Sequence, residues 1–166
     1  TAQSKLIAWK LGLTNIDPTG TTVIDGKGTL PRVIGHRNPS QTSCPGAKYY
    51  ALLPGIRTRA KAYQGTMLYE PSQSTTSLPY GSGTVTVKAR ASTSVSWTLS
   101  VSSVCRTEAQ YTRKGTASTT TPVSATWTGK LADGRAAPPG QYRLTVTANS
   151  GSGTAATSAP VVRIVT

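Results

Sequence analysis

The sequence predicts an α+β protein, with a helix, a short strand and a helix over residues 1–64 and an antiparallel β-sandwich over residues 65–166. In residues 4–13 and 49–60 the apolar residues follow the three-and-four spacing of helices, whereas from Thr84 onward they alternate with polar residues. Clusters of Gly, Pro, Asn and Asp interrupt the alternation at short intervals, as expected between the strands of a sandwich. The two parts are therefore expected to be separate domains.

The first part begins with an expected helix over residues 4–13, where apolar residues recur at helical spacing and Gly12 offers a stop. Beyond it, a turn-rich stretch surrounds a short expected strand, Thr21–Ile24. A second short strand, buried and preceding the histidine, is expected at Arg32–Gly35.

The second expected helix begins at Pro45, because the missing N–H of proline costs nothing at the first helical position. Basic residues near its end suit the helix dipole, and Pro54 is expected to kink the helix or to divide it. The expected apolar face consists of Tyr49, Leu52, Leu53, Ile56 and Ala60.

These elements are too few to bury the apolar residues that they carry. A strand at Arg32–Gly35 needs partner strands for its backbone groups, and the surrounding sequence does not provide them. We therefore expect residues 1–64 to be the C-terminal portion of a larger α/β domain whose start is not in this chain. On this view either a leader was removed or the chain is a fragment.

The second part carries alternating segments that predict strands. Trp97 and Trp127 are expected to anchor its core, with carbohydrate stacking as the alternative role for either ring. The predicted strands are Thr84–Ala89, Val95–Val101, Tyr142–Ala148 and Val161–Val165.

The net charge of +13 arises because only five of the 166 residues are acidic. The bases are scattered singly, without the runs typical of nucleic-acid-binding tails, so no nucleic-acid partner is expected. A field of this sign attracts polyanions such as phosphate-bearing cell-wall polymers; a cationic surface without any ligand is the alternative. No apolar run is long enough to span a membrane.

The only histidine, His36, lies eight positions before Cys44, with turn-forming residues between them. Imidazole and thiolate are preferred zinc ligands, and a short turn can bring both to one metal. A lone histidine after an apolar strand is more often a hydrogen-bonded structural residue than a ligand, and a single cysteine is more often a small buried apolar residue. For Cys105 the alternatives are burial, a disulfide to a cysteine outside this chain, or a disulfide to Cys44 if Cys44 is not a ligand.

Around these two residues the sequence resembles the end of a bacterial peptidoglycan-recognition-type N-acetylmuramoyl-L-alanine amidase. The resemblance covers residues 1 to about 62 and implies a mixed sheet flanked by helices, with zinc held by two histidines and a cysteine. His36 matches the second histidine and Cys44 the cysteine. The matching segments are Ile7–Leu11, Val33–Arg37, Thr42–Gly46 and Tyr50–Arg57.

The resemblance also implies a reaction, the hydrolysis of the amide bond between N-acetylmuramic acid and L-alanine in peptidoglycan. In such a site zinc lowers the pKa of its bound water and polarises the carbonyl. Thr42 matches a position that helps to hold the reacting carbonyl, which makes it the catalytic candidate. Arg37 and Asn38 are the candidate substrate-binding residues; Arg37 alternatively binds its own loop, and Asn38 stands where the family usually has aspartate.

The first zinc histidine and the tyrosine or acid that handles the water belong to the family's N-terminal half. We therefore expect this chain to be active only with an associated N-terminal fragment, as a secreted, cell-wall-associated enzyme whose partner is peptidoglycan. The alternative is a non-catalytic wall-binding or structural protein derived from an amidase.

In the second part, Trp127–Gly129, Asp133-Gly134 and Pro139-Gly140 followed by Tyr142 resemble the immunoglobulin-like module of flagellar hook-cap proteins and secreted actinobacterial enzymes. This resemblance implies an immunoglobulin-like sandwich and says little about its ligand.

Overall fold

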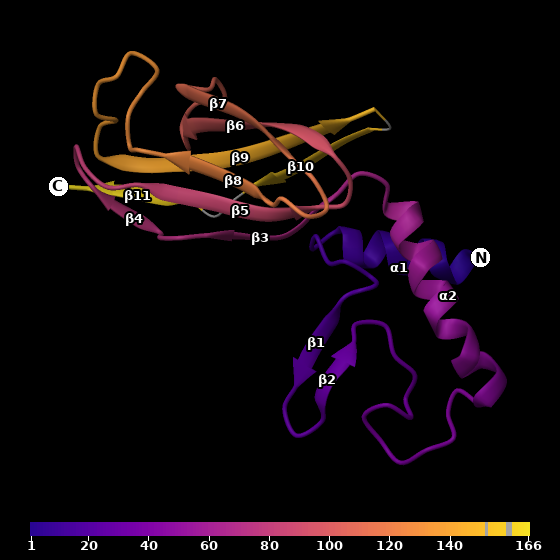
Figure 1. Ribbon diagram of the computed structural model, residues 1–166. Helices are drawn as coiled ribbons and strands as arrows, with labels where there is room; N and C mark the ends of the chain where they lie inside the picture. The colour runs from indigo at the N-terminus through magenta and orange to yellow at the C-terminus, as the bar shows by residue number, and fades with distance from the viewer. Residues whose placement is uncertain (152, 159–160) are drawn as a thin grey trace. The chain divides into compact units, whose positions relative to one another are not determined.

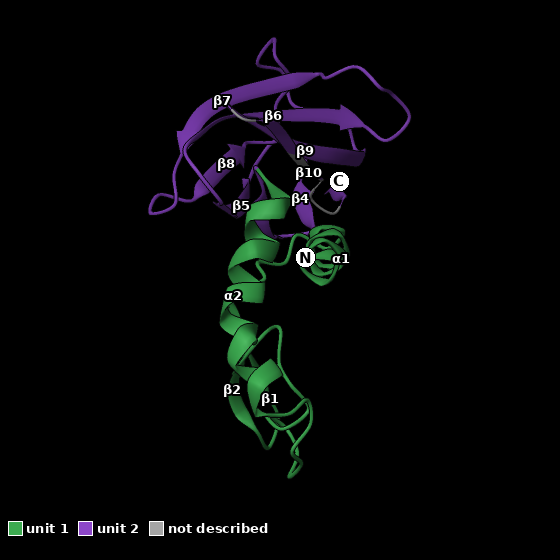
Figure 2. Cartoon of the chain, turned by 90° about the vertical axis from the view of Figure 1, so that its right-hand side faces the viewer, with its two compact units in different colours: residues 1–65 green, residues 66–166 purple. Residues whose placement is uncertain are grey.

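A computed structural model describes residues 1–151, 153–158 and 161–166. The chain forms two compact units, Thr1–Gly65 and Thr66–Thr166, which Figure 1 shows by element and Figure 2 by colour. The helices lie in the first unit and the second is a β-sandwich, so the predicted α+β fold class is confirmed. The boundary falls one residue after the expected one.

Unit 1 contains the helix α1 (Ala2–Gly12), the hairpin strands β1 (Thr21–Ile24) and β2 (Gly28–Pro31), and the helix α2 (Ala47–Gln64). Helix α1 begins two residues earlier than expected, and the side chain of Thr1 caps it by accepting the Ser4 N–H. The strand expected at Thr21–Ile24 is confirmed, and it pairs with β2 in antiparallel register. Within the described residues, no helix has the length and apolar character needed to cross a bilayer.

Two expectations for unit 1 are wrong. Residues 32–35 form no strand, because no described strand lies beside them and an isolated strand has no ladder for its backbone groups. Helix α2 begins at Ala47, two residues after Pro45, where it was expected to begin. Of the two effects expected of Pro54, a division of the helix does not occur. Of the expected apolar face, Leu53, Ile56 and Ala60 are buried, whereas Leu52 is 55% exposed.

Polar contacts fasten the end of α2 within unit 1. The buried Asp17 carboxylate accepts a hydrogen bond from Lys61 Nζ at 2.8 Å and two more from the backbone and hydroxyl of Thr19. Gln64 Nε2 donates to one backbone carbonyl of α1 and to one in the loop that follows. Burial of Asp17 opposes ionisation, but the hydrogen bonds from Lys61 and Thr19 outweigh it and hold the pKa of the carboxyl below its ordinary value.

Unit 2 is built from two sheets. The smaller has the strand order β3 (Leu68–Gln73), β5 (Val85–Ala91), β8 (Val123–Trp127). The larger has the order β4-β11-β9-β6-β7, with β10 also paired to β9. Its strands are β4 (Ser77–Pro79), β6 (Val95–Ser103), β7 (Tyr111–Ala117), β9 (Gly140–Ser150), β10 (Gly153–Ser158) and β11 (Val162–Val165). All described pairs are antiparallel except β4 with β11, so the expected antiparallel sandwich contains one parallel pair.

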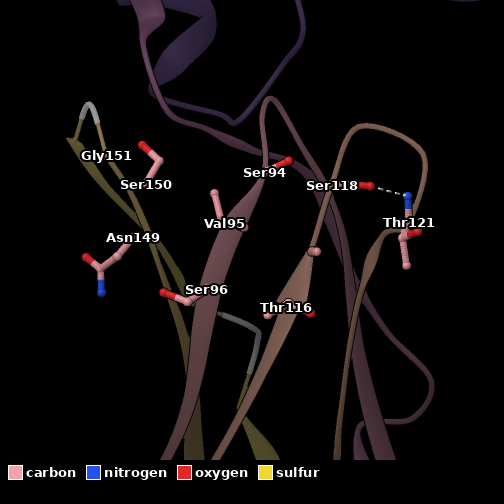
Figure 3. A pocket seen from close by; sticks show the side chains of 10 residues that line it. Ser94, Val95, Ser96, Thr116, Ser118, Thr121, Asn149, Ser150 and Gly151 are labelled. Atoms are coloured by element: carbon pink, nitrogen blue, oxygen red, sulfur yellow. Dashed lines mark hydrogen bonds between the residues drawn. The ribbon is translucent and has the colours of Figure 1, made fainter.

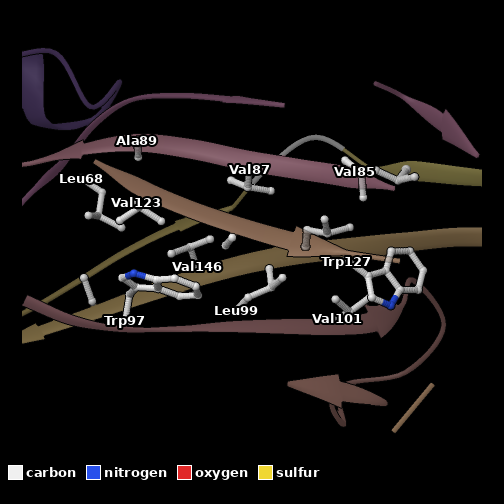
Figure 4. Packing of buried hydrophobic residues seen from close by; sticks show 14 of the residues in the cluster. Leu68, Val85, Val87, Ala89, Trp97, Leu99, Val101, Val123, Trp127 and Val146 are labelled. Atoms are coloured by element: carbon white, nitrogen blue, oxygen red, sulfur yellow. The ribbon is translucent and has the colours of Figure 1, made fainter. Parts of the chain in front are cut away.

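The core of unit 2 lies between the two sheets, where alternate residues of β5, β6, β8 and β9 point inward (Figure 4). The expected core positions of Trp97 and Trp127 are confirmed, since their exposed fractions are 6% and 0%. Trp127 Nε1 donates to the Lys130 carbonyl at 2.7 Å, and its ring lies 5.2 Å from that of Tyr142. The Tyr142 hydroxyl donates to the Pro138 carbonyl four residues upstream, as in the tyrosine corner of immunoglobulin domains.

Gly115 on β7 leaves the space that the Trp97 ring fills. A Cβ at this position would lie 2.3 Å from Trp97 Cζ2, far inside van der Waals contact. We expect Gly115→Ala to lower the free energy of unfolding of unit 2 by about 1 to 3 kcal/mol, because the indole must move and its 3.1 Å hydrogen bond to the Thr116 carbonyl must strain. Urea unfolding of Gly115→Ala in the wild-type and Trp97→Leu backgrounds measures this. An equal cost in both backgrounds would show that the clash is not the cause.

The charge of Asp17 should stabilise unit 1 to the full extent only above its unfolded-state pKa. Because the native pKa lies below the ordinary value of 3.8, the stabilisation is complete above about pH 5 and is lost as the pH falls through the native value. We expect Asp17→Asn to weaken unit 1 by about 1 to 3 kcal/mol at pH 7 and progressively less below pH 4, measured by amide hydrogen exchange in α2. The exposed Asp25→Asn is the matched control and should change little; equal effects of both substitutions would contradict the assignment.

Candidate metal-binding loop

All the sequence-predicted site residues lie in the segment 33–46 between β2 and α2, here called the candidate loop. A backbone hydrogen bond from Arg37 N–H to the Cys44 carbonyl, 3.0 Å long, closes it. Tighter turns form at each end, from Asn38 N–H to the Gly35 carbonyl and from Gly46 N–H to the Ser43 carbonyl. This hydrogen bond brings the backbone of Arg37, the residue after His36, beside the backbone of Cys44. In the sequence, seven residues separate His36 from Cys44.

Gly35 permits a second contact between the two ends of the candidate loop. It is buried, and a Cβ there would lie 2.7 Å from Pro45 Cδ and 3.1 Å from Tyr50 Cδ2. Any other residue would push the two ends of the loop apart. The glycine before His36 therefore has a packing role in keeping His36 near Cys44.

Asn38 ties the candidate loop to α2. Its Oδ1 accepts the Gly35 N–H at 3.0 Å, and its Nδ2 donates to the Tyr50 hydroxyl at 2.8 Å. The Arg37 guanidinium lies 4.7 Å from the centre of the Tyr50 ring, in cation–π geometry. Tyr50 is thus the anchor for both candidate substrate-binding residues. The local sequence pattern places Tyr50 only in the helix, since nothing in it indicates a partner twelve residues upstream.

The chemically reactive side chains of the candidate loop face solvent. His36 and Cys44 are both exposed, and His36 makes no hydrogen bond to the described residues. Thr42 Oγ1 accepts the Cys44 N–H at 3.2 Å, which orients the hydroxyl. No acceptor for the Thr42 hydroxyl proton lies within the described part of the chain, so that proton is available for donation.

The candidate loop offers zinc two of the three protein ligands that a catalytic site needs. His36 and Cys44 have suitable donor atoms, but the described residues contain no group of three His, Cys, Asp or Glu side chains placed to hold a metal ion. A zinc-bound histidine ordinarily donates its second ring N–H to a fixed acceptor, and the described residues give His36 none. The donor types therefore fit zinc, and the donor set is incomplete.

The two cysteines are free and exposed. Of the alternatives for Cys105, burial is therefore wrong. The alternative that Cys44 is a small buried apolar residue is wrong for the same reason. Cys44 is accessible as a ligand.

No protein-family model matches the chain, and no curated protein matches it. Among solved structures, the chain is similar to the crystal structure of dimeric latent PorU from Porphyromonas gingivalis, with a TM-score of 0.45 and 10% sequence identity. The similarity covers 57% of this chain and 9% of that chain.

The two hydrogen bonds of the Asn38 side chain should control the order of the candidate loop. We expect Asn38→Ala to increase amide hydrogen exchange across residues 33–46 by about thirtyfold, since two hydrogen bonds worth roughly 1 kcal/mol each are lost. Asn38→Asp should stay near wild type, because a carboxylate can accept from both Gly35 N–H and the Tyr50 hydroxyl. Tyr50→Phe should give an intermediate increase. Unchanged exchange in Asn38→Ala would show that the loop does not depend on this side chain.

Proposed function

We propose that unit 1 is the C-terminal portion of a secreted, zinc-dependent N-acetylmuramoyl-L-alanine amidase, which hydrolyses the bond between N-acetylmuramic acid and L-alanine in peptidoglycan. One observation carries the proposal: the backbone closure from Arg37 to Cys44 holds an exposed imidazole and an exposed thiol at the same end of a short loop. The sequence resemblance over residues 1 to about 62 supports it.

In this proposal His36, as neutral imidazole, and Cys44, as thiolate, hold the metal. The third ligand comes from polypeptide outside residues 1–166, because the chain has a single histidine and its described residues offer no third donor beside these two. Zinc, when bound, supplies a Lewis acid for the substrate carbonyl and lowers the pKa of a bound water.

Thr42 is the candidate donor to the carbonyl oxygen. The Cys44 N–H fixes its hydroxyl oxygen, and the hydroxyl proton remains free to stabilise the negative charge that develops on the substrate oxygen. A preorganised donor of this kind typically contributes about a hundredfold or more to the rate.

Arg37 and Asn38 separate into two roles. Arg37 is exposed while its guanidinium rests on the Tyr50 ring, so it can meet a carboxylate of the stem peptide. Asn38 uses both polar atoms of its side chain within the protein, which supports a positioning role in place of the substrate contact expected from the sequence.

A second candidate function is supported by the histidine count. With one histidine in 166 residues, the chain by itself fits a non-catalytic wall-binding or structural protein derived from an amidase. In both cases we propose a secreted, wall-associated protein whose net charge of +13 helps to hold it on anionic wall polymers, an effect that salt weakens.

The metal ligands can be tested with cobalt, which absorbs strongly when a thiolate binds it. We expect the purified chain to bind Co²⁺ and Zn²⁺ weakly, with a thiolate-to-cobalt absorption band that is lost in Cys44→Ser and weakened in His36→Ala. Cys105→Ser is the matched control, because Cys105 is also exposed and free. A band that depends on Cys105 and not on Cys44 would contradict the assignment.

The activity is tested with the chain alone and with a longer polypeptide that supplies the third ligand. The chain alone should not cleave a muramoyl-peptide, whereas the longer polypeptide should release the peptide in a zinc-dependent reaction that His36→Ala and Cys44→Ser abolish. We expect Thr42→Val to lower kcat by about a hundredfold with little change in zinc affinity. Hydrolysis by residues 1–166 alone would refute the need for a third ligand, and an inactive longer polypeptide would favour the non-catalytic function.

A further inference from the structure

The outer face of the larger sheet carries a regular array of small polar side chains. Along β6 and β9 the inward residues are buried in the core, and the alternate residues are half-buried or exposed. Register places these outward residues in rows across β7, β6 and β9. One row is Thr116, Ser96 and Asn149, and another is Thr112, Ser100 and Thr145.

The row between them consists of Lys114, Thr98 and Thr147. Adjacent strands lie about 4.8 Å apart and successive rows about 6.7 Å apart, so hydroxyl and amide groups repeat at these spacings across a rigid surface. We call this surface the hydroxyl face. At its end, Ser96, Thr116 and Asn149 help to line an open depression of about 690 Å³, and Figure 3 shows them on three neighbouring strands.

The hydroxyl face continues into a pair of arginines. Arg143 on β9 lies opposite Ser102 of β6, and Arg163 on β11 lies opposite Gln141, two residues before Arg143. The two arginines are thus diagonal neighbours on one side of the sheet, within reach of a single anionic group. Both are exposed, and neither has an ion-pair partner among the described residues.

No acidic residue lies on these strands. The three acids of unit 2 are elsewhere: Glu70 on β3, Glu108 between β6 and β7, and Asp133 between β8 and β9. Glu70 and Asp133 each pair with a local arginine. The cations of the hydroxyl face therefore act on solvent without a counter-charge built into the surface.

The side chains of the hydroxyl face also argue against several classes of binding partner. The aromatic residues of β6 and β9, Trp97 and Tyr142, point into the core, so the hydroxyl face has no ring on which a sugar or a base could stack. The outward residues of β6 and β9 are all polar or charged, so these two strands offer no apolar patch to bury against another protein. What remains is a set of hydrogen-bonding groups at fixed spacing and three cations that have no ion-pair partner among the described residues. This set matches a chain of alternating phosphates and hydroxylated spacers.

We propose that the hydroxyl face of unit 2 binds a phosphodiester-linked polyol polymer. Arg143 and Arg163 bind a phosphate together, Lys114 binds another, and the Ser and Thr hydroxyls between them hydrogen-bond to the polyol. This interaction is separate from the amidase proposal, because it uses neither the candidate loop nor a metal.

The test measures binding of the full chain to synthetic poly(glycerol phosphate) by calorimetry at 0.15 M salt with EDTA present. We expect the triple substitution Lys114→Gln, Arg143→Gln, Arg163→Gln to weaken binding by at least about tenfold. The matched control, Lys88→Gln, Arg106→Gln, Lys130→Gln, removes the same charge from exposed positions off the hydroxyl face and should weaken binding by less than about threefold. Circular dichroism checks that both variants fold.

The double substitution Thr98→Val, Thr147→Val removes two hydroxyls and keeps shape and charge, and should weaken binding by about threefold or more. Equal losses in the two charge variants would overturn the proposal, because binding would then follow net charge alone. Duplex DNA that binds as tightly, with the same dependence on the hydroxyl face, would overturn the assignment to a polyol. Absence of binding to poly(glycerol phosphate) would overturn the whole proposal. The His36→Ala variant should bind the polymer as tightly as the wild type does. Failure of the amidase proposal can therefore be distinguished from failure of this one.

Discussion

The antiparallel pairing of β6 with β9 over eight residue pairs is the constraint on which unit 2 depends. A slip of one residue would carry Trp97 and Leu99 into solvent and bury Ser96 and Thr98 between the sheets. Each hydroxyl buried without a partner costs about 1 to 3 kcal/mol, and each lost apolar side chain about as much. The core therefore fixes the register, and the arrangement of polar groups on the opposite side follows from the same alternation.

Unit 1 is held together in a different way. Its buried apolar side chains are few, Ala8, Pro18, Leu53, Ile56 and Ala60, while Leu6 and Leu13 are more than half exposed. Polar contacts between the loops and α2 position much of the unit, such as the ion pair between Asp17 and Lys61 and the hydrogen bond from Arg57 to the Val33 carbonyl. Because such contacts compete with water, we expect unit 1 to open more readily than the sandwich.

Sequence patterns predicted β5, β6 and β9 to within a few residues, since one face of each is apolar throughout. They missed β7, whose central residues Arg113, Lys114 and Gly115 break the alternation, and they misjudged residues 32–35, since a strand needs a neighbour that local pattern does not reveal. For the candidate loop, residue types identified the donor atoms. The packing of Gly35 on Pro45 and the hydrogen bond from Asn38 to Tyr50 are tertiary contacts, which only the folded chain shows.

The tryptophan of unit 1 and the two tryptophans of unit 2 differ in their exposure to solvent. Trp9 in α1 is 61% exposed, whereas Trp97 and Trp127 are almost completely shielded inside the sandwich. A water-soluble quencher such as iodide therefore reaches the indole of unit 1 and not those of unit 2, and the quenched and unquenched emission report on different units. The intrinsic tryptophan fluorescence therefore reports on each unit separately, and the order in which the two units unfold can be followed without attaching a dye.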